Sequence, residues 1–178
     1  MTSNSDPEPA QHDWRTPTRV DGPAGPRPPS SHLVVGFDRH HTSHAALEFA
    51  IGLAGQLNAH LHVAHVIDTD DLPIDSDAAD WDHAITAVIE HERDEACSRL
   101  AALGGNWTYH CHHGQPAHVL SSIAETHDAA MIVIGTPRAG LMPLVERLLG
   151  GSVSAQLIHH SHRPVLLVPD RTTPTTGQ

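Results

Sequence analysis

Short apolar runs alternate with helix-length segments along the central part of the chain, and this alternation limits the fold more than any other sequence feature. Five runs are typical of buried strands, at residues 33–37, 61–67, 107–112, 131–134 and 165–168. Between them, apolar residues recur at helical spacing, as in Ala46, Leu47, Ala50 and Ile51. Strands joined by helical crossovers pair in parallel. We therefore expect an α/β fold, a five-stranded parallel sheet with helices on both faces.

The two ends of the chain differ from this central part. Residues 1–30 hold seven of the 14 prolines and few branched apolar residues. Such a segment cannot bury enough apolar surface to offset the entropy lost on ordering. We expect a disordered N-terminal arm at residues 1–30, a single α/β domain at residues 31–169 and a loose C-terminal tail at residues 170–178.

The charged residues exclude several classes of function. All ten basic residues are arginine, so the chain lacks a P-loop lysine, a Schiff-base lysine and a lysine general base. The net charge is -11 and the arginines are scattered, which argues against nucleic-acid binding.

Other features of the sequence indicate where the protein is found. The sequence contains no run of about 18 apolar residues, so we expect no membrane span. Cys97 and Cys111 form no CxxC motif and indicate reduced thiols. We expect a cytoplasmic protein.

Candidate ligand-binding residues follow the predicted strands. Ligands of open parallel sheets bind at the carboxyl ends of the strands. Asp38 directly follows the first strand, where its carboxylate can accept hydrogen bonds from a ribose or an adenine amino group; the alternative is that it only caps the next helix. Glycines follow the fourth strand at Gly135, and Gly150-Gly151-Ser152 opens the helix before the fifth. Backbone N–H groups at such positions can hold a phosphate without lysine.

Several motifs together resemble the universal stress protein family over nearly all of residues 31–168. His65-Val66-Ile67-Asp68 ends the second strand, and Gly114-Gln115-Pro116 precedes the third helix. The most specific segments are Ile132-Val133-Ile134-Gly135-Thr136, Leu148-Leu149-Gly150-Gly151-Ser152-Val153-Ser154 and Arg163-Pro164-Val165-Leu166-Leu167-Val168. The resemblance implies a Rossmann-like sheet of strand order 3-2-1-4-5. It also implies a homodimer formed through the last strand, at Val165, Leu166, Leu167 and Val168.

One branch of this family binds ATP through a glycine motif, which the resemblance transfers to this chain. It implies Asp38 and Val66 at the adenine and ribose, Ile134 and Gly135 beneath the nucleotide, and Gly151, Ser152 and Val153 at the phosphates. The sequence departs from the motif, because Pro137 and Arg138 replace its second glycine and the stretch to Gly151 is three residues longer. Pro137 has no N–H to donate to an anion. Arg138 either supplies charge to the phosphates or fills the pocket.

The resemblance implies a stress-response dimer that binds ATP as a regulatory ligand. We expect no enzymatic activity beyond slow ATP hydrolysis, because no residue is an evident base for water. The alternative is a nucleotide-free member of the family that acts through protein–protein interaction. Equilibrium binding of ATP distinguishes the two.

The 18 histidines raise a third possibility, a metal-binding protein. His60 and His62 lie two apart on one predicted strand, as do His110 and His112 on another, so each pair points to one face of the sheet. The implied strand order makes these strands neighbours, where four imidazoles can converge on zinc, nickel or copper. The alternative is that they satisfy local hydrogen bonds in a partly solvated region. No compact metal motif accompanies them, and we expect no metal cofactor.

The histidines also predict a pH-dependent charge. If all 18 titrate near their usual pKa of about 6.5, protonation changes the formal charge from -11 to +7. We therefore expect solubility, self-association or anion affinity to change between about pH 5 and pH 7.

Overall fold

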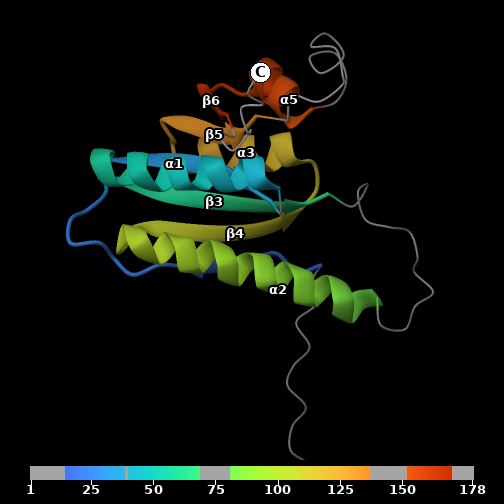
Figure 1. Ribbon diagram of the computed structural model, residues 1–178. Helices are drawn as coiled ribbons and strands as arrows, with labels where there is room; N and C mark the ends of the chain where they lie inside the picture. The colour runs from blue at the N-terminus through green and yellow to red at the C-terminus, as the bar shows by residue number, and fades with distance from the viewer. Residues whose placement is uncertain (1–14, 39, 69–80, 137–151, 170–178) are drawn as a thin grey trace, which may run out of the picture.

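The computed structural model describes residues 15–38, 40–68, 81–136 and 152–169, which form one sheet with helices packed on it (Figure 1). The elements in chain order are β1 (Thr18–Asp21), β2 (Ser31–Phe37), α1 (His41–Leu57), β3 (Ala59–Ile67), α2 (Trp81–Leu100), the short 3-10 helix η2 (Ala101–Leu103), β4 (Trp107–His113), α3 (Pro116–Thr126), β5 (Met131–Gly135), α5 (Val153–His160) and β6 (Val165–Val168). The fold is therefore α/β, as the alternation of apolar runs and helices predicts.

The sheet has the order β1-β4-β3-β2-β5-β6. Every pairing among β4, β3, β2, β5 and β6 is parallel. In chain order these five strands are the third, second, first, fourth and fifth, so the predicted order 3-2-1-4-5 is confirmed for them. The sheet is one strand wider than expected, because β1 pairs antiparallel with β4.

Strand β1 falls in the segment that the sequence predicts to be disordered, and for residues 18–21 this prediction was wrong. Without β1, the backbone N–H and C=O groups on the outer side of β4 would lie unpaired at the edge of the sheet. Pairing with β1 gives these groups hydrogen-bond partners. The connection to β2 is held by further hydrogen bonds, from the Gly22 N–H to the Trp107 carbonyl (2.9 Å) and from the Asn106 N–H to the Pro23 carbonyl (2.9 Å). Backbone pairing needs no apolar pattern, so composition did not indicate this strand. Residues 1–14 and 170–178 lie outside the described residues.

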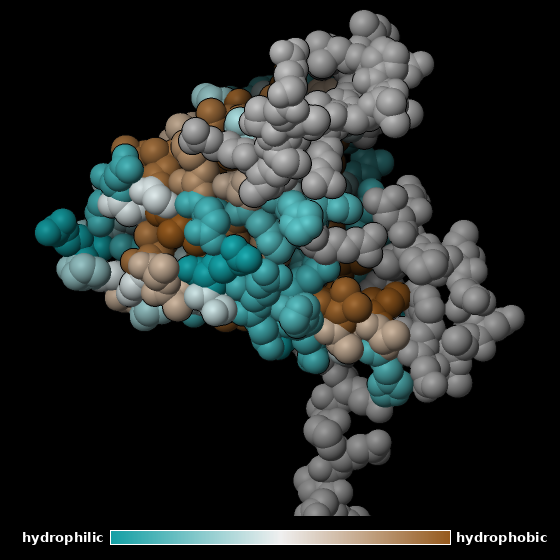
Figure 2. Space-filling view, viewed as in Figure 1, coloured by the Kyte–Doolittle hydropathy of each residue, from teal (hydrophilic) through white to brown (hydrophobic). Residues whose placement is uncertain are grey.

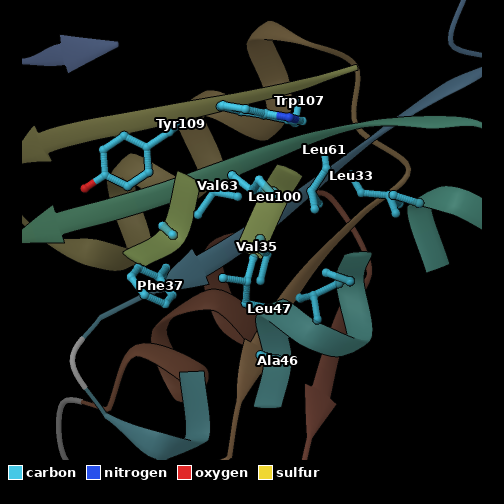
Figure 3. Packing of buried hydrophobic residues seen from close by; sticks show 14 of the residues in the cluster. Leu33, Val35, Phe37, Ala46, Leu47, Leu61, Val63, Leu100, Trp107 and Tyr109 are labelled. Atoms are coloured by element: carbon cyan, nitrogen blue, oxygen red, sulfur yellow. The ribbon is translucent and has the colours of Figure 1, made fainter. Parts of the chain in front are cut away.

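The larger hydrophobic core lies between the sheet and the helices α1 and α2 (Figure 3). Side chains at odd-numbered positions of β2, β3, β4 and β5 point to this face, because neighbouring residues of a strand alternate between faces. The core contains Leu33, Val35 and Phe37 of β2, Leu61, Val63 and Ile67 of β3, and Trp107, Tyr109 and Cys111 of β4. Alanines of α1 and Leu100 of α2 pack against them. The core is mainly aliphatic, as the 3% aromatic content requires.

The second core lies on the opposite face, under α3 and α5. Even-numbered strand residues point to it, among them Val34, Ala64, Ile132 and Ile134, and they pack against Leu120, Ile123 and Leu157 of the two helices. This core is smaller, and beside it the same face carries polar side chains, including buried His62, Thr108 and His110. This face therefore holds both the apolar wall of a pocket and a group of histidines.

The surface of the described residues is mixed in character. Hydrophilic side chains cover much of the face shown in Figure 2, with smaller apolar areas between them. Phe49, Leu57, Val88, Ile158 and Leu167 are the large apolar residues that the structure exposes. Within the described ranges, no helix has the length and apolar character needed to cross a membrane.

Replacing Gly22 by alanine is expected to destabilise the fold. A Cβ atom at Gly22 would overlap the indole ring of Trp107, which is buried under β1. The ring or the strand must move, which costs about 1–3 kcal/mol in a well-packed core. Urea denaturation measures the change. Gly52→Ala is the matched control, because open space surrounds Gly52 in α1 and alanine there should add about 0.5–1 kcal/mol. Equal stability of Gly22→Ala and the unmodified chain would contradict this packing.

Candidate functional site

A pocket of about 260 Å³ lies at the carboxyl ends of β2, β3 and β5. It also borders the first turns of α1, α3 and α5, so six elements contribute to its wall. Six residues predicted from the sequence line it: Asp38, Val66, Ile134, Gly135, Ser152 and Val153. The other two predicted residues, Arg138 and Gly151, lie outside the described residues. The pocket stands where a parallel sheet presents its ligand-binding edge.

The loop after β2 holds Asp38 in a network of short hydrogen bonds. The His40 N–H donates to Asp38 Oδ1 (2.8 Å), and the Asp38 N–H donates to the hydroxyl of Ser43 (3.1 Å). That hydroxyl lies 2.7 Å from the Asp38 carbonyl and 2.8 Å from the His40 carbonyl. Asp38 thus stabilises the turn that precedes α1, but it does not cap the helix as the alternative proposes, because His40 is the N-cap and no side-chain hydrogen bond caps this helix. In the described part of the chain no hydrogen bond uses its second carboxylate oxygen, Oδ2, which leaves that oxygen available to a ligand.

Gly135 ends β5 at a close approach to α1. A Cβ atom there would overlap the backbone carbonyl of Thr42, so packing alone requires glycine at this position. The wall at Gly135 is consequently backbone, with Ile134 beside it. Packing against Thr42 is thus sufficient to explain the glycine at position 135, with or without a ligand. The absence of a side chain there also leaves space in the pocket.

The N-terminus of α5 forms the polar side of the pocket. Ser152 caps the helix, its Oγ accepting from the Ala155 N–H (3.3 Å) and lying 3.1 Å from Ser154 Oγ. Ser152, Val153 and Ser154 all line the pocket. Free N–H groups and the helix dipole make such an N-terminus favourable for an anion.

Several lining residues were not among those predicted: Gly36, Phe37, His40, Thr42, Ser43, Ala64, Pro116, Leu120 and Ser154. The first turns of α1 and α3 supply three of them, Thr42, Ser43 and Pro116. Their signal in the sequence was their position, directly after a strand and at the start of a helix. Motif matching alone did not identify His40, because the transferred glycine motif contains no histidine.

Six histidines gather on the face of the sheet that carries α3, and we call them the histidine cluster. They are His32 of β2, His60 and His62 of β3, His110 and His112 of β4, and His127 at the end of α3. His62 Nε2 lies 3.0 Å from His32 Nδ1, and His62 Nδ1 lies 3.1 Å from His110 Nε2. The ring of His127 stacks on His62 with centroids 3.9 Å apart. His62 is therefore the centre of the cluster.

The four histidines predicted as converging ligands are only partly brought together. His62 and His110 are in contact, but His60 Nε2 lies 2.9 Å from Thr108 Oγ1, and His112 reaches only the ring of His110, at 6.1 Å between centroids. The register explains this, because Ala64 pairs with His110 and Val66 with His112. His60 and His112 are thus offset by six strand positions, or about 20 Å. In the described residues a tighter group is His32, His62 and His127.

Burial lowers the pKa values of five members of the histidine cluster and so disfavours their charged forms. Loss of hydration, together with repulsion from neighbouring imidazoles, lowers the pKa of His62 to about 2. Burial and the nearby positive groups of Arg19, His112 and His127 lower the pKa of His110 to about 4. Burial also lowers the pKa values of His60, His112 and His127. The expectation that all histidines titrate near pH 6.5 therefore fails for these five, and their imidazoles are neutral at neutral pH.

A different histidine, His65, lies on the opposite face of β3 in a buried polar group. Its Nε2 is 2.9 Å from Glu92 Oε2 of α2, and its Nδ1 is 2.8 Å from the Tyr109 hydroxyl. Burial opposes protonation, but interactions with Cys111 and Glu92 outweigh it and raise the pKa of His65 to about 9. His65 is therefore protonated at neutral pH, and its buried contact with Glu92 links α2 to the sheet.

Comparison with known proteins gives a consistent result. The model of the universal stress protein family matches residues 30–169. Among curated proteins, Universal stress protein MJ0531 of Methanocaldococcus jannaschii is 29% identical over 141 residues, covering 76% of this chain and 80% of that protein. A universal stress protein of Mycobacterium tuberculosis is 27% identical over 164 residues, and there the match spans only 49% of the longer relative.

Solved structures show the same similarity. A universal stress protein in complex with cAMP is 29% identical, with a TM-score of 0.56 over 78% of this chain and 95% of that chain. A protein of the universal stress protein family from Burkholderia pseudomallei is 27% identical, with a TM-score of 0.59 over 80% of this chain and 100% of that chain. Both similarities extend over most of the described domain.

Replacing Glu92 by glutamine is expected to lower stability in a pH-dependent way. The raised pKa of His65 means that the stabilisation is complete below about pH 6.5 and is lost as the pH rises through about 9. At pH 6 the unmodified chain should exceed Glu92→Gln by about 1.5–3 kcal/mol in unfolding free energy, as for a hydrogen bond to a charged group, and the difference should shrink towards pH 10. Chemical denaturation at a series of pH values measures this.

Asp94→Asn is the control for this experiment, because Asp94 lies on the same helix but its side chain is 71% exposed. Its stability should stay within about 0.5 kcal/mol of the unmodified chain. A Glu92→Gln difference that is constant from pH 6 to pH 10 would show that the His65–Glu92 pair is not the cause.

Proposed function

Because the chain belongs to the universal stress protein family, we propose that it is a cytoplasmic stress-response protein that binds an adenine nucleotide, ATP, as a regulatory ligand with little or no turnover. The observation that carries this proposal is the pocket itself. Six residues that were selected from sequence motifs line one cavity at the carboxyl edge of the sheet, and they come from β3, β5, the loop after β2 and the start of α5. The 29% identical relative in complex with cAMP supports an adenine nucleotide as the ligand class.

The adenosine part of the ligand fits the chemistry of the pocket. Val66, Ala64 and Ile134 provide apolar surface for a base. Asp38 Oδ1 is already used by the His40 N–H, and Oδ2 accepts a hydrogen bond from a ribose hydroxyl or the adenine amino group. A volume of about 260 Å³ is close to the lower end of small-molecule sites, roughly 300 Å³, and suits a nucleoside.

The phosphates are assigned to the polar side of the pocket. In a chain without lysine, the N-terminus of α5 with the hydroxyls of Ser152 and Ser154 supplies the donors. We assign Gly151 to the phosphates from the motif, and Arg138, which stands where the motif has a glycine, from its positive charge. Hydrolysis is not part of the proposed role, since the function of a regulatory ligand is to remain bound.

Replacing Asp38 by asparagine tests the nucleotide site. The amide oxygen of asparagine can still accept from the His40 N–H and preserve the turn, but the charged acceptor for the ligand is lost. Hydrogen bonds to a charged group contribute about 1.5–3 kcal/mol, so ATP affinity should fall about 10- to 100-fold. Isothermal titration calorimetry on the full chain measures this, and chromatography of the recovered nucleotide shows whether ATP is intact.

The exposed Asp94→Asn serves as the control and should bind ATP as the unmodified chain does. If ATP, AMP and cAMP all fail to bind saturably, the nucleotide proposal is wrong, and a family member acting through protein–protein interaction replaces it. If ATP binds but Asp38→Asn binds equally well, the assignment of Asp38 is wrong.

We further propose that two copies pair through β6 to form a homodimer. Within the described ranges this strand, Val165, Leu166, Leu167 and Val168, pairs on one side only, with β5, and Leu167 is 38% exposed. An open edge with exposed apolar side chains favours pairing with a second copy. Sedimentation should show a dimer at micromolar concentration, and Leu167→Glu should shift it to monomer.

Phe49→Glu provides the comparison for the dimer experiment, because Phe49 is 45% exposed but lies on α1. It should leave the dimer intact. A monomer in the unmodified chain, or an equal effect of the two substitutions, would contradict pairing through β6.

A further inference from the structure

We propose that His32, His62 and His127 form a binding site for one divalent transition-metal ion of the zinc type. The three residues come from β2, β3 and the end of α3, and they lie apart from the pocket to which ATP is assigned. This inference does not depend on nucleotide binding. It differs from the set of four histidines that sequence spacing suggests, since only His62 is common to both.

The spacing of the ligand atoms supports this site. Each of the three histidines offers a ring nitrogen, and these atoms all lie within 4.8 Å of one another. In a tetrahedral zinc site, metal–nitrogen distances of about 2.0–2.1 Å place the ligand nitrogens about 3.4 Å apart. The nitrogens of His32 and His62 already meet at 3.0 Å. The ring of His127 stacks on His62 and must turn edge-on to complete the site.

The orientation of His62 is set by a partner behind it. If Nδ1 of His62 donates its proton to His110 Nε2, at 3.1 Å, then Nε2 of His62 carries a lone pair that faces His32. Metal-binding histidines commonly have such an outer partner, which selects the tautomer and holds the ring. His110 is therefore a positioning residue and not a ligand. On binding, the metal takes the place of the proton between His32 and His62, and this proton moves to Nε2 of His32, which thereby adopts its other neutral tautomer.

Access and ligand chemistry indicate which ions fit. His62 is 2% exposed, whereas His32 and His127 are only partly buried, so an ion can enter from the solvent side and keep a water as a fourth ligand. The group contains only imidazoles, with no carboxylate among its members. Three imidazoles suit zinc, copper or nickel, whereas magnesium and calcium require oxygen ligands.

The competing interpretation is that these rings are only a hydrogen-bonded, metal-free group. His127 distinguishes the two interpretations. In the described part of the chain no hydrogen bond uses either of its ring nitrogens, although its ring lies directly against His62. The hydrogen-bond chain from His32 through His62 to His110 does not use the ring nitrogens of His127. A metal site formed by His32, His62 and His127 does use one of them.

Calorimetric titration of the untagged full chain with zinc chloride, without nucleotide, tests the site. We expect one tightly bound equivalent. His32→Gln and His127→Gln should each weaken zinc binding at least about tenfold. Removing even an outer hydrogen-bond partner of a metal ligand typically lowers metal affinity by that factor, and these substitutions remove a ligand itself. Titration with cobalt chloride should show the visible absorption of tetrahedral cobalt, which both variants should lose. Both residues are only partly buried, so these variants should fold even if His62→Gln does not.

His118→Gln is the matched control, because His118 is an exposed histidine on the same helix α3. It should bind zinc as the unmodified chain does. The proposal is overturned if zinc shows no saturable binding, or if it binds equally well to His32→Gln and His127→Gln, because surface histidines would then account for the uptake. A tight site that is lost only in His118→Gln would overturn it as well.

Discussion

The parallel register of β2, β3 and β4 is the constraint on which both candidate sites depend. It pairs Val34 with His62 and Ala64 with His110, so that one parity of residues meets α3 and the other meets α1 and α2. A slip of one residue would exchange the faces of every side chain in a strand. The leucines and valines of β3 would then lie among the histidines. The buried apolar face on the α1 side excludes that slip, since Leu61 and Val63 must remain in the larger core.

Local patterns predicted which segments are parallel strands, whereas the strand order and six residues of the pocket were predicted with the help of the family resemblance. Buried parallel strands leave continuous apolar runs, and their carboxyl ends meet at one edge, so Asp38 and Gly135 could be placed together from their position after a strand. Strand β1 could not be predicted, because it depends on backbone pairing with β4 and on the fit of Gly22 against Trp107. Neither interaction produces an apolar pattern in a proline-rich segment.

The histidine cluster shows a second limit of sequence reasoning. Spacing by two identified His60 with His62 and His110 with His112, but spacing says nothing about how far along the sheet one pair lies from the other. Strand parity could have added His32, which lies two positions before Val34 on the same face. His127 could not be found in this way, because its place at the end of α3 depends on how the helix packs back across the sheet. Its contact with His62 is a product of tertiary structure alone.

The two proposed sites share β3 but are separated along it. His62 and Val66 lie four positions apart, or about 13 Å along the strand. A bound dication would attract the phosphates of a nucleotide, and because His62 is 2% exposed, solvent screens this attraction less than it would between two surface charges. Without a metal, the buried imidazoles of His62 and His110 add no charge, because burial lowers their pKa values. Zinc and ATP are therefore expected to raise each other's affinity, by the same factor in both directions.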